Sequence, residues 1–209
     1  MSQVQLSLVD SLRERKKAAT RQRISDIATG LFAERGFDNV TVNEIAAAAE
    51  VSKVTVFNYF PRKEDIFFDR IPQAAELITA AVRDRGAGVT PLAALRGLVL
   101  ELAEQRHPLG GVREPYAHFW RLVQDSPALR ARVREVVDEW EILLAGLLAE
   151  HSDDPHPRLT AALAVAGYRI GYLAAVERTL AGDSADQITA DLVSAINAAF
   201  DILERGLGS

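Results

Sequence analysis

Apolar side chains recur at helical spacing along almost the whole chain, and this pattern constrains the fold more than any other feature of the sequence. The clearest stretch follows the i, i+3, i+4, i+7, i+8 spacing of one buried helix face: Ile24, Ile27, Ala28, Leu31 and Phe32. Gly36 is expected to end this helix, because glycine readily takes the left-handed conformation found after a last helical turn. No segment shows the sustained alternation of a β-hairpin, so the sequence predicts an all-α fold.

Two short helices are predicted directly after this first one. Thr41 and Glu44 have the spacing of a capping box, in which the hydroxyl accepts a hydrogen bond from the Glu44 N–H and the carboxylate reaches back. Ser52 can cap the second short helix, which Pro61 ends. This arrangement matches a helix-turn-helix, whose second helix enters the major groove of DNA. Short helices also occur in bundles that bind no DNA, so spacing alone leaves both interpretations open.

Six further helices are predicted between breaks rich in Gly, Pro and capping residues. Their expected ranges are 63–84, 91–106, 114–125, 127–151, 157–181 and 185–206. The division between domains is expected near Lys63, without a flexible linker. Residues 1–63 are predicted to form an N-terminal three-helix DNA-binding domain with a basic N-terminal arm, and residues 64–209 a C-terminal helical bundle.

The charge of the chain is unevenly distributed. The whole chain carries −5, but residues 1–64 hold 10 basic against 8 acidic groups, and residues 65–209 hold 14 against 21. The excess of basic groups is concentrated in residues 13–23, where a phosphate contact would need it. Two interpretations of this segment stay open, an arm that reaches the minor groove and a solvated helix start; its first four basic residues are Arg13, Arg15, Lys16 and Lys17.

Several classes of function are disfavoured by what the sequence lacks. It has no cysteine, which excludes thiolate nucleophiles and Cys-ligated metals, and it contains none of the HExxH, Walker, GxGxxG or GxSxG motifs. We therefore expect no enzymatic activity, no metal and no cofactor. The segment 151–156 is interpreted as a loop between helices. The apolar stretch 159–176 contains Arg169 and two glycines and is interpreted as a buried helix, so we expect a cytoplasmic protein with no membrane segment.

The residues of the two short helices and their flanks closely resemble the TetR family of bacterial repressors. The resemblance covers residues 20–68 and is carried by Ala33-Glu34-Arg35-Gly36-Phe37, by Thr41-Val42-x-x-Ile45-Ala46-x-x-Ala49-x-Val51-Ser52 and by Thr55-x-Phe57-Asn58-Tyr59-Phe60-Pro61-x-Lys63-Glu64. It implies a homodimeric transcriptional regulator that binds a palindromic double-stranded operator and is released by an unknown small-molecule effector. The alternatives are a ligand-independent or activating regulator and a helical small-molecule carrier.

Individual DNA contacts follow from position and from this resemblance. Base-reading roles are predicted for Asn43, Lys53, Val54, Thr55 and Asn58. Phosphate contacts are predicted for Thr41, Ser52, Phe57, Tyr59 and Lys63, although core packing is an equal alternative for Phe57. Glu50 departs from the family pattern, because many members carry Gly there. A Glu at this position can still be helical, in which case the turn starts one residue later.

The last two helices carry the candidate dimer interface. Their small and apolar stripes comprise Ala164, Gly167, Gly171, Ala175, Ile188, Leu192, Ala195, Ile196, Ala199 and Leu203. Such stripes permit close approach of two helices, and an intrachain core is the alternative.

A candidate effector pocket is drawn from aromatic and polar residues between 107 and 172. Its members are His107, Tyr116, His118, Trp120, Arg121, Trp140, Tyr168, Arg169 and Tyr172. Arg169 is singled out because an arginine in an apolar helix needs a partner, either an anionic ligand or an internal carboxylate such as Glu114 or Glu139.

Overall fold

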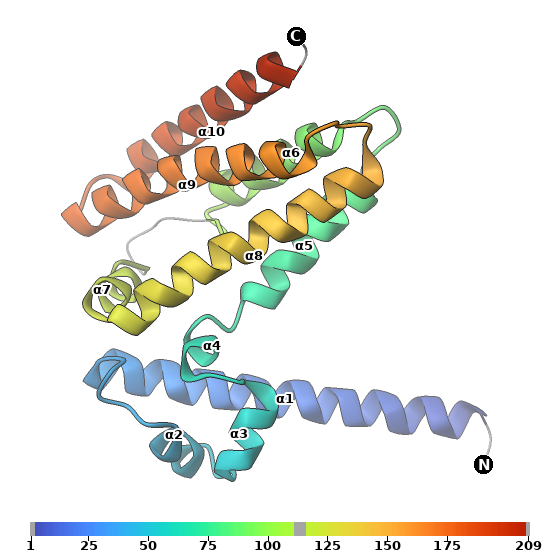
Figure 1. Cartoon of the computed structure of the whole chain (residues 1–209). Coiled ribbons are helices and arrows are strands. Elements are labelled where there is room, and N and C mark those ends of the chain that lie inside the picture. Colours follow the sequence, from blue (N-terminus) through green and yellow to red (C-terminus); the bar gives the residue numbers. More distant parts are fainter. Residues whose placement is uncertain (1–2, 111–115, 208–209) are drawn as a thin grey trace. The chain divides into compact units, whose positions relative to one another are not determined.

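The computed structural model describes residues 3–110 and 116–207, and within these ranges the chain contains helices and no strand (Figure 1), which confirms the all-α prediction. The chain divides into two compact units, Met1–Asp69 and Arg70–Ser209, so the division falls after Asp69 rather than after Lys63. The reason is that the fourth helix packs into the first unit, where its Ile66 is only 1% exposed.

The first unit contains α1 (Gln3–Arg35), α2 (Val42–Ala48), α3 (Lys53–Tyr59) and α4 (Lys63–Phe67). Its core is centred on three aromatic rings, with centroids 5.0 Å apart for Phe32 and Phe37, 5.9 Å for Phe32 and Phe67, and 5.7 Å for Phe37 and Phe67. Gly36 ends α1 with a φ of +80°, as the sequence predicts.

The single helix expected over 63–84 is in fact two helices, α4 and α5 (Ile71–Arg83). Pro72 explains the break, because proline lacks an N–H and its ring clashes with the carbonyl four residues earlier in a continuous helix. The intervening Asp69 is held by α1. Its carboxylate accepts a hydrogen bond from Ser25 Oγ at 2.5 Å, and its carbonyl accepts one from Arg21 at 3.0 Å. Pro72 was the signal in the sequence that could have located this break.

The second unit is a helical bundle. It contains α5, α6 (Pro91–Glu104), α7 (Ala117–Asp125), α8 (Pro127–His151), α9 (Pro157–Ala181) and α10 (Ala185–Leu207). Proline occupies the first position of three of these helices, where its missing N–H costs no helical hydrogen bond. The ranges predicted for α8 and α9 agree with the structure. α9 packs against α8 on one side and α10 on another (Figure 1).

The predicted dimer stripe turns out to join α9 to α10 within one chain. A Cβ added at Gly167 would lie 2.9 Å from Cβ of Ala199, and one at Gly171 would lie 3.1 Å from Cβ of Ala195. The small residues therefore serve close packing inside the subunit. The prediction is corrected for the seven members that are buried within the subunit: Ala164, Gly171, Ala175, Ile188, Leu192, Ile196 and Leu203. The other three are half-buried in the same contact, and their part in a dimer stays a prediction: Gly167, Ala195 and Ala199.

Candidate nucleic-acid interface

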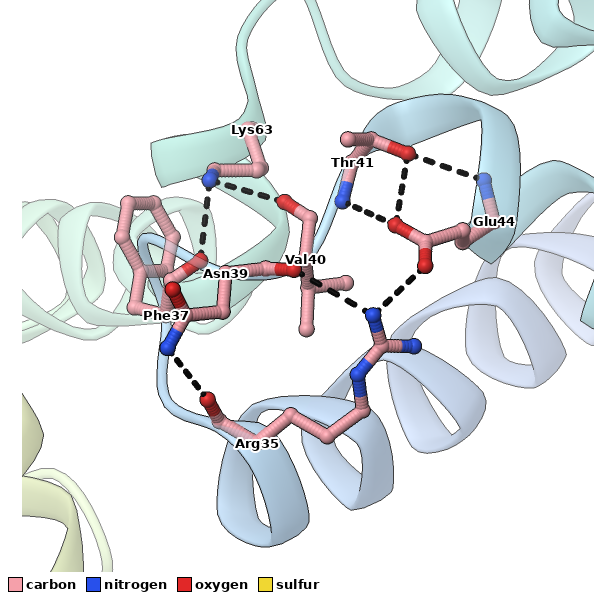
Figure 2. A network of polar contacts seen from close by, with 7 residues as sticks. All are labelled: Arg35, Phe37, Asn39, Val40, Thr41, Glu44 and Lys63. Carbon is pink, nitrogen blue, oxygen red and sulfur yellow. Dashed lines mark hydrogen bonds and ion pairs between the residues drawn. The ribbon is translucent and has the colours of Figure 1, made fainter.

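The start of α2 is fixed by the predicted capping box. Thr41 Oγ1 accepts from the Glu44 N–H at 3.3 Å, and the Thr41 N–H donates to the Glu44 carboxylate at 2.8 Å. Arg35 at the end of α1 forms an ion pair with the same carboxylate at 2.6 Å (Figure 2). These contacts, with Arg35 contributing most, lower the pKa of Glu44 to about 2. Below that pH the carboxylate would be protonated and the link from α1 to α2 weakened.

Lys63, at the start of α4, holds the loop between α1 and α2. Its Nζ donates to the carbonyl oxygens of Phe37 and Val40, both at 2.9 Å, and lies 4.0 Å from the centroid of the Phe37 ring (Figure 2). Partial burial lowers the pKa of Lys63. Two of its three N–H groups are thus used within the protein, a structural role that sequence reasoning missed. The phosphate contact predicted for Lys63 stays a prediction and would use the third N–H.

The turn between α2 and α3 is a Schellman motif with Glu50 at its left-handed position. The Val51 N–H donates to the carbonyl of Ala46 and the Glu50 N–H to that of Ala47, while Glu50 has a φ of +53°. The expectation that Glu50 could extend the helix is therefore wrong. This position favours glycine, which explains why glycine is common here in the family pattern. Lys53 does not pair with Glu50; its Nζ lies 5.9 Å from the centroid of the Phe57 ring.

The outward face of α3 carries most of the predicted base-reading residues. Ser52 caps the helix as predicted, accepting from the Thr55 N–H at 3.0 Å. Val54 is 68% exposed, and Lys53 and Asn58 are also exposed, whereas Val56 and Phe60 are buried on the opposite face. Thr55 is half-buried, and its hydroxyl lies 2.8 Å from Ser52 Oγ, so its side chain belongs mainly to the cap.

The remaining predicted contacts flank this face. Asn43 and Thr41 are exposed at the start of α2, and Phe57 is 42% exposed, so it is not a core residue in this unit. Tyr59 is half-buried. The structure therefore brings the predicted set onto α2, α3 and the residue that begins α4, all within the first unit.

The basic segment is part of a continuous α1 rather than an extended arm. Its first four cationic side chains are exposed: Arg13, Arg15, Lys16 and Lys17. Arg21 has a different role, because its guanidinium lies 4.5 Å from the centroid of the Phe60 ring and donates to the carbonyl of Asp69. Arg21 therefore connects α1 to Phe60, directly after α3, and to Asp69, after α4.

The predicted effector residues separate into two groups in the second unit. His118, Arg121 and Arg169 are exposed, so the expectation that Arg169 is buried and needs a partner is wrong for the single chain. The aromatic members are partly buried instead: Trp120, Trp140, Tyr168 and Tyr172 all pack against the bundle core. Of the rest, His107 Nδ1 accepts from the Leu109 N–H at 3.2 Å, and Tyr116 is half-buried before α7. Glu114 lies outside the described residues.

An aromatic cluster of Trp120, Tyr168 and Tyr172 joins α7 to α9, and Trp140 of α8 packs against the same bundle core. The ring centroids of Trp120 and Tyr172 are 5.7 Å apart, and those of Tyr168 and Tyr172 are 5.6 Å apart. Burial raises the pKa of both phenols, while a hydrogen bond from Trp120 to Tyr172 acts in the opposite direction. The indole Nε1 of Trp140 is buried without a hydrogen-bond partner among the described residues. Because burial raises the pKa of Tyr168 and of Tyr172, both phenols are neutral at physiological pH.

The buried arginine of the second unit is Arg132 on α8, which is 7% exposed. It donates to both carboxylate oxygens of Glu139, at 2.6 and 3.2 Å, and forms a second ion pair with Glu135 at 3.5 Å. Glu139 is thus not a partner of Arg169. Arg132 and Glu139 are two helical turns apart on α8, and this spacing was the signal in the sequence that could have revealed the pair. The described residues contain no group of three or more side chains suited to hold a metal ion.

Taken with its caps and its Schellman turn, the pair α2 and α3 forms a helix-turn-helix that presents a polar and cationic face. The class of protein is thereby defined as a helix-turn-helix DNA-binding regulator. Residues 24–69 match the family described as "Bacterial regulatory proteins, tetR family", and residues 89–208 match the "MftR C-terminal domain". The chain belongs to the TetR family of bacterial transcriptional regulators.

Individual relatives agree with this assignment. The HTH-type transcriptional regulator TcmR of Streptomyces glaucescens is 32% identical over 166 residues, 73% of this chain and 71% of that protein. The regulator MftR of Mycobacterium tuberculosis is 27% identical over 211 residues, 92% of this chain and 93% of that protein. The crystal structure of Thermus thermophilus FadR, a TetR-family repressor in complex with lauroyl-CoA, has a TM-score of 0.55 and 26% identity and covers 90% of this chain and 94% of that one.

Replacement of Glu50 by glycine tests the left-handed turn. Glu50→Gly removes the Cβ that disfavours a positive φ and is expected to raise the free energy of unfolding by about 0.5–1 kcal/mol, measured by urea denaturation. Glu50→Ala is the matched control, because it removes the carboxylate but keeps the Cβ, and it should give no such gain. Equal stability of the two variants would contradict the assignment of the turn.

Proposed function

We propose that the chain acts as a homodimeric repressor that binds a palindromic operator in the cytoplasm and is released by a small-molecule effector. The observation that carries the DNA-binding part is the outward face of α3, where Lys53, Val54 and Asn58 are exposed on a helix capped at its start. Hydrogen-bonding groups on such a face can reach base edges in the major groove. An activating regulator would use the same face and differ only in what binding does to transcription.

Phosphate contacts are proposed for the flanks of this face. Tyr59 offers a hydroxyl group, and Ser52 lies at the start of α3, where the helix dipole favours an anion. The Thr41 hydroxyl donates to the Glu44 carboxylate at 2.7 Å, so its contact with a phosphate would replace that hydrogen bond. Lys63 retains one N–H for this purpose. The exposed cations of α1 at positions 13–17 add positive charge to the same unit, against the acidic second unit. Contacts of this type position the protein and make binding fall with salt.

Selection from a randomised duplex DNA pool with the full-length protein is expected to enrich an inverted repeat. Asn58→Ala should then bind that repeat about 10- to 100-fold more weakly and with relaxed preference at one base pair per half-site, because an Asn side chain can form two hydrogen bonds to adenine. Electrophoretic mobility shifts measure both effects. Gln187→Ala, a change to an exposed amide of α10, is the control and should bind normally. Failure to enrich any sequence would refute the proposed function.

A second copy of the chain is proposed to pack on the outward side of α9 and α10. Large apolar side chains are exposed there at helical spacing: Leu159, Leu163, Ile170 and Leu173 on α9, with Ile202 on α10. α9 is also the described helix that is long and apolar enough to cross a membrane, but its inner side packs against α8 and α10 as a bundle helix does. An apolar face on a DNA-binding subunit that reads half-sites is best explained by a two-fold partner.

Introduction of a charge on this face should separate the subunits. Ile170→Glu is expected to shift the protein from dimer to monomer in analytical ultracentrifugation at micromolar concentration, because two-fold symmetry buries the new carboxylate twice. Ile142→Glu changes an equally exposed isoleucine of α8, which is 74% exposed, and should leave the dimer intact. If the two variants sediment alike, the proposed face is not the interface.

The aromatic cluster is proposed as the effector site. Neutral phenols at Tyr168 and Tyr172, the unpartnered indole N–H of Trp140 and the pairing of Arg132 with Glu139 favour an uncharged aromatic ligand that offers a hydrogen-bond acceptor. The lauroyl-CoA bound to FadR shows that a member of the family can take a ligand.

Of the two tryptophans of the chain, Trp120 lies in this cluster and Trp140 packs against the same bundle core, so ligand binding is expected to change the intrinsic fluorescence. Titration with 1,4-naphthoquinone, as a neutral aromatic carbonyl compound, should give a saturable change, whereas decanoate should not. Trp140→Phe removes one hydrogen bond and should weaken binding about 3- to 10-fold. Arg169→Met alters an exposed residue and serves as the control. A response to decanoate that Arg169→Met abolishes would overturn the choice of ligand class.

A further inference from the structure

We propose that Val54 determines operator specificity by packing its two methyl groups against the 5-methyl group of a thymine in each half-site. This inference rests on the proposed function, since it concerns the same face of α3. Val54 is 68% exposed, the largest exposure of a large apolar side chain in the described part of the first unit. Val54 lies beside the exposed Lys53 and Asn58 on the face of α3 that is proposed to enter the major groove, so DNA bound there would cover it.

The position of Val54 on α3 favours contact with base edges in the major groove over contact with the sugar-phosphate backbone. Val54 and Asn58 are one helical turn apart and share a face. This face lies opposite the buried Val56 and Phe60, both at most 1% exposed. Phe57 and Lys53 lie to one side of it, with Lys53 Nζ 5.9 Å from the Phe57 ring centroid. Side chains at the centre of the outward face point toward base edges, and those at its sides point toward the sugar-phosphate backbone.

The chemistry of a base edge then identifies the partner. In the major groove the four bases present hydrogen-bonding groups, and thymine alone adds a methyl group. A valine can satisfy no donor or acceptor, so an adjacent polar edge would lose water without compensation. The thymine methyl is the one feature of the groove that valine matches. Asn58, one turn away, can pair with adenine, so the two residues together favour adjacent A·T pairs.

A protein partner fits this face less well. Lys53 and Asn58 border Val54, and the segment 13–17 adds four exposed cations to the same unit. Val54 and Phe57 are the large apolar side chains exposed on α3, and polar and cationic neighbours of so small an apolar patch are suited to an anionic, wet interface such as duplex DNA. A protein interface would instead have a larger apolar centre.

Substitution of deoxyuridine for thymidine tests the inference, because it removes the methyl group and leaves every hydrogen-bonding group in place. The full-length protein is first used to select an inverted repeat from a randomised duplex pool, and each thymidine of the repeat is then replaced in turn. One position per half-site should weaken binding about fourfold, and replacement in both half-sites about fifteenfold, as expected for exposure of one methyl group at each.

Two variants complete the test. Val54→Ala removes the two γ-methyl groups that are proposed to contact thymine. This variant should bind the thymidine and deoxyuridine repeats with nearly equal affinity. Val89→Ala makes the same change at a valine of the second unit that is 40% exposed, and it should retain the full preference for thymidine. The inference is overturned if deoxyuridine has no effect at any position, or if Val54→Ala keeps the same preference. Failure of the selection itself would instead count against the proposed function.

Discussion

The arrangement of the DNA-binding unit depends on one ammonium group placed on two carbonyl oxygens. Gly36 ends α1 abruptly, and the loop that follows leaves the carbonyls of Phe37 and Val40 outside any helix. Lys63 Nζ binds both at 2.9 Å and lies on the Phe37 ring. Because α4 also carries Ile66 into the same core, the end of α1, the start of α2 and the start of α4 are fixed together. The direction of the helix-turn-helix relative to α1 follows from this junction.

In the turn between α2 and α3, packing outweighs the preference of a residue with a Cβ for a negative φ. A residue with a Cβ in the left-handed region is disfavoured by roughly 1–2 kcal/mol, yet Glu50 takes it with a φ of +53°. The two Schellman hydrogen bonds and the burial of Ala46 and Ala49 hold α2 at the distance from α3 that the core requires. The exposed carboxylate lies next to the start of α3, so under the proposed function it would repel the phosphates of a bound duplex. Such repulsion would favour binding that relies on base contacts over binding to the DNA backbone alone.

Local features of the sequence were predictable, and contacts between helices were not. The caps at Thr41 and Ser52 and the end of α1 at Gly36 depend on residues within one turn, so spacing was sufficient to place them. Spacing also identified which residues of α9 share a face, but it could not say what that face meets. Close approach of small residues looks the same within a subunit and between subunits, and the Gly167–Ala199 contact proved to be internal. Arg169 was misplaced for the same reason, because the helix is apolar on both its inner and its outer side.

α9 combines three roles in the second unit through three sides of one helix. Gly167 and Gly171 permit close packing on α10, Tyr168 and Tyr172 enter the aromatic cluster with α7, and Leu163 and Ile170 remain exposed on the outside. A ligand that displaces the Tyr172 ring must therefore act on the same rigid element that carries the proposed dimer face. The close approach of Gly167 to Ala199 opposes a tilt of α9 toward α10, so under the proposed function a displacement of α9 would run along its axis or as a rotation. Under the proposed function, α9 alone could couple the effector site to the dimer face. This requires two positions of α9, one of which binds the ligand more tightly than the other.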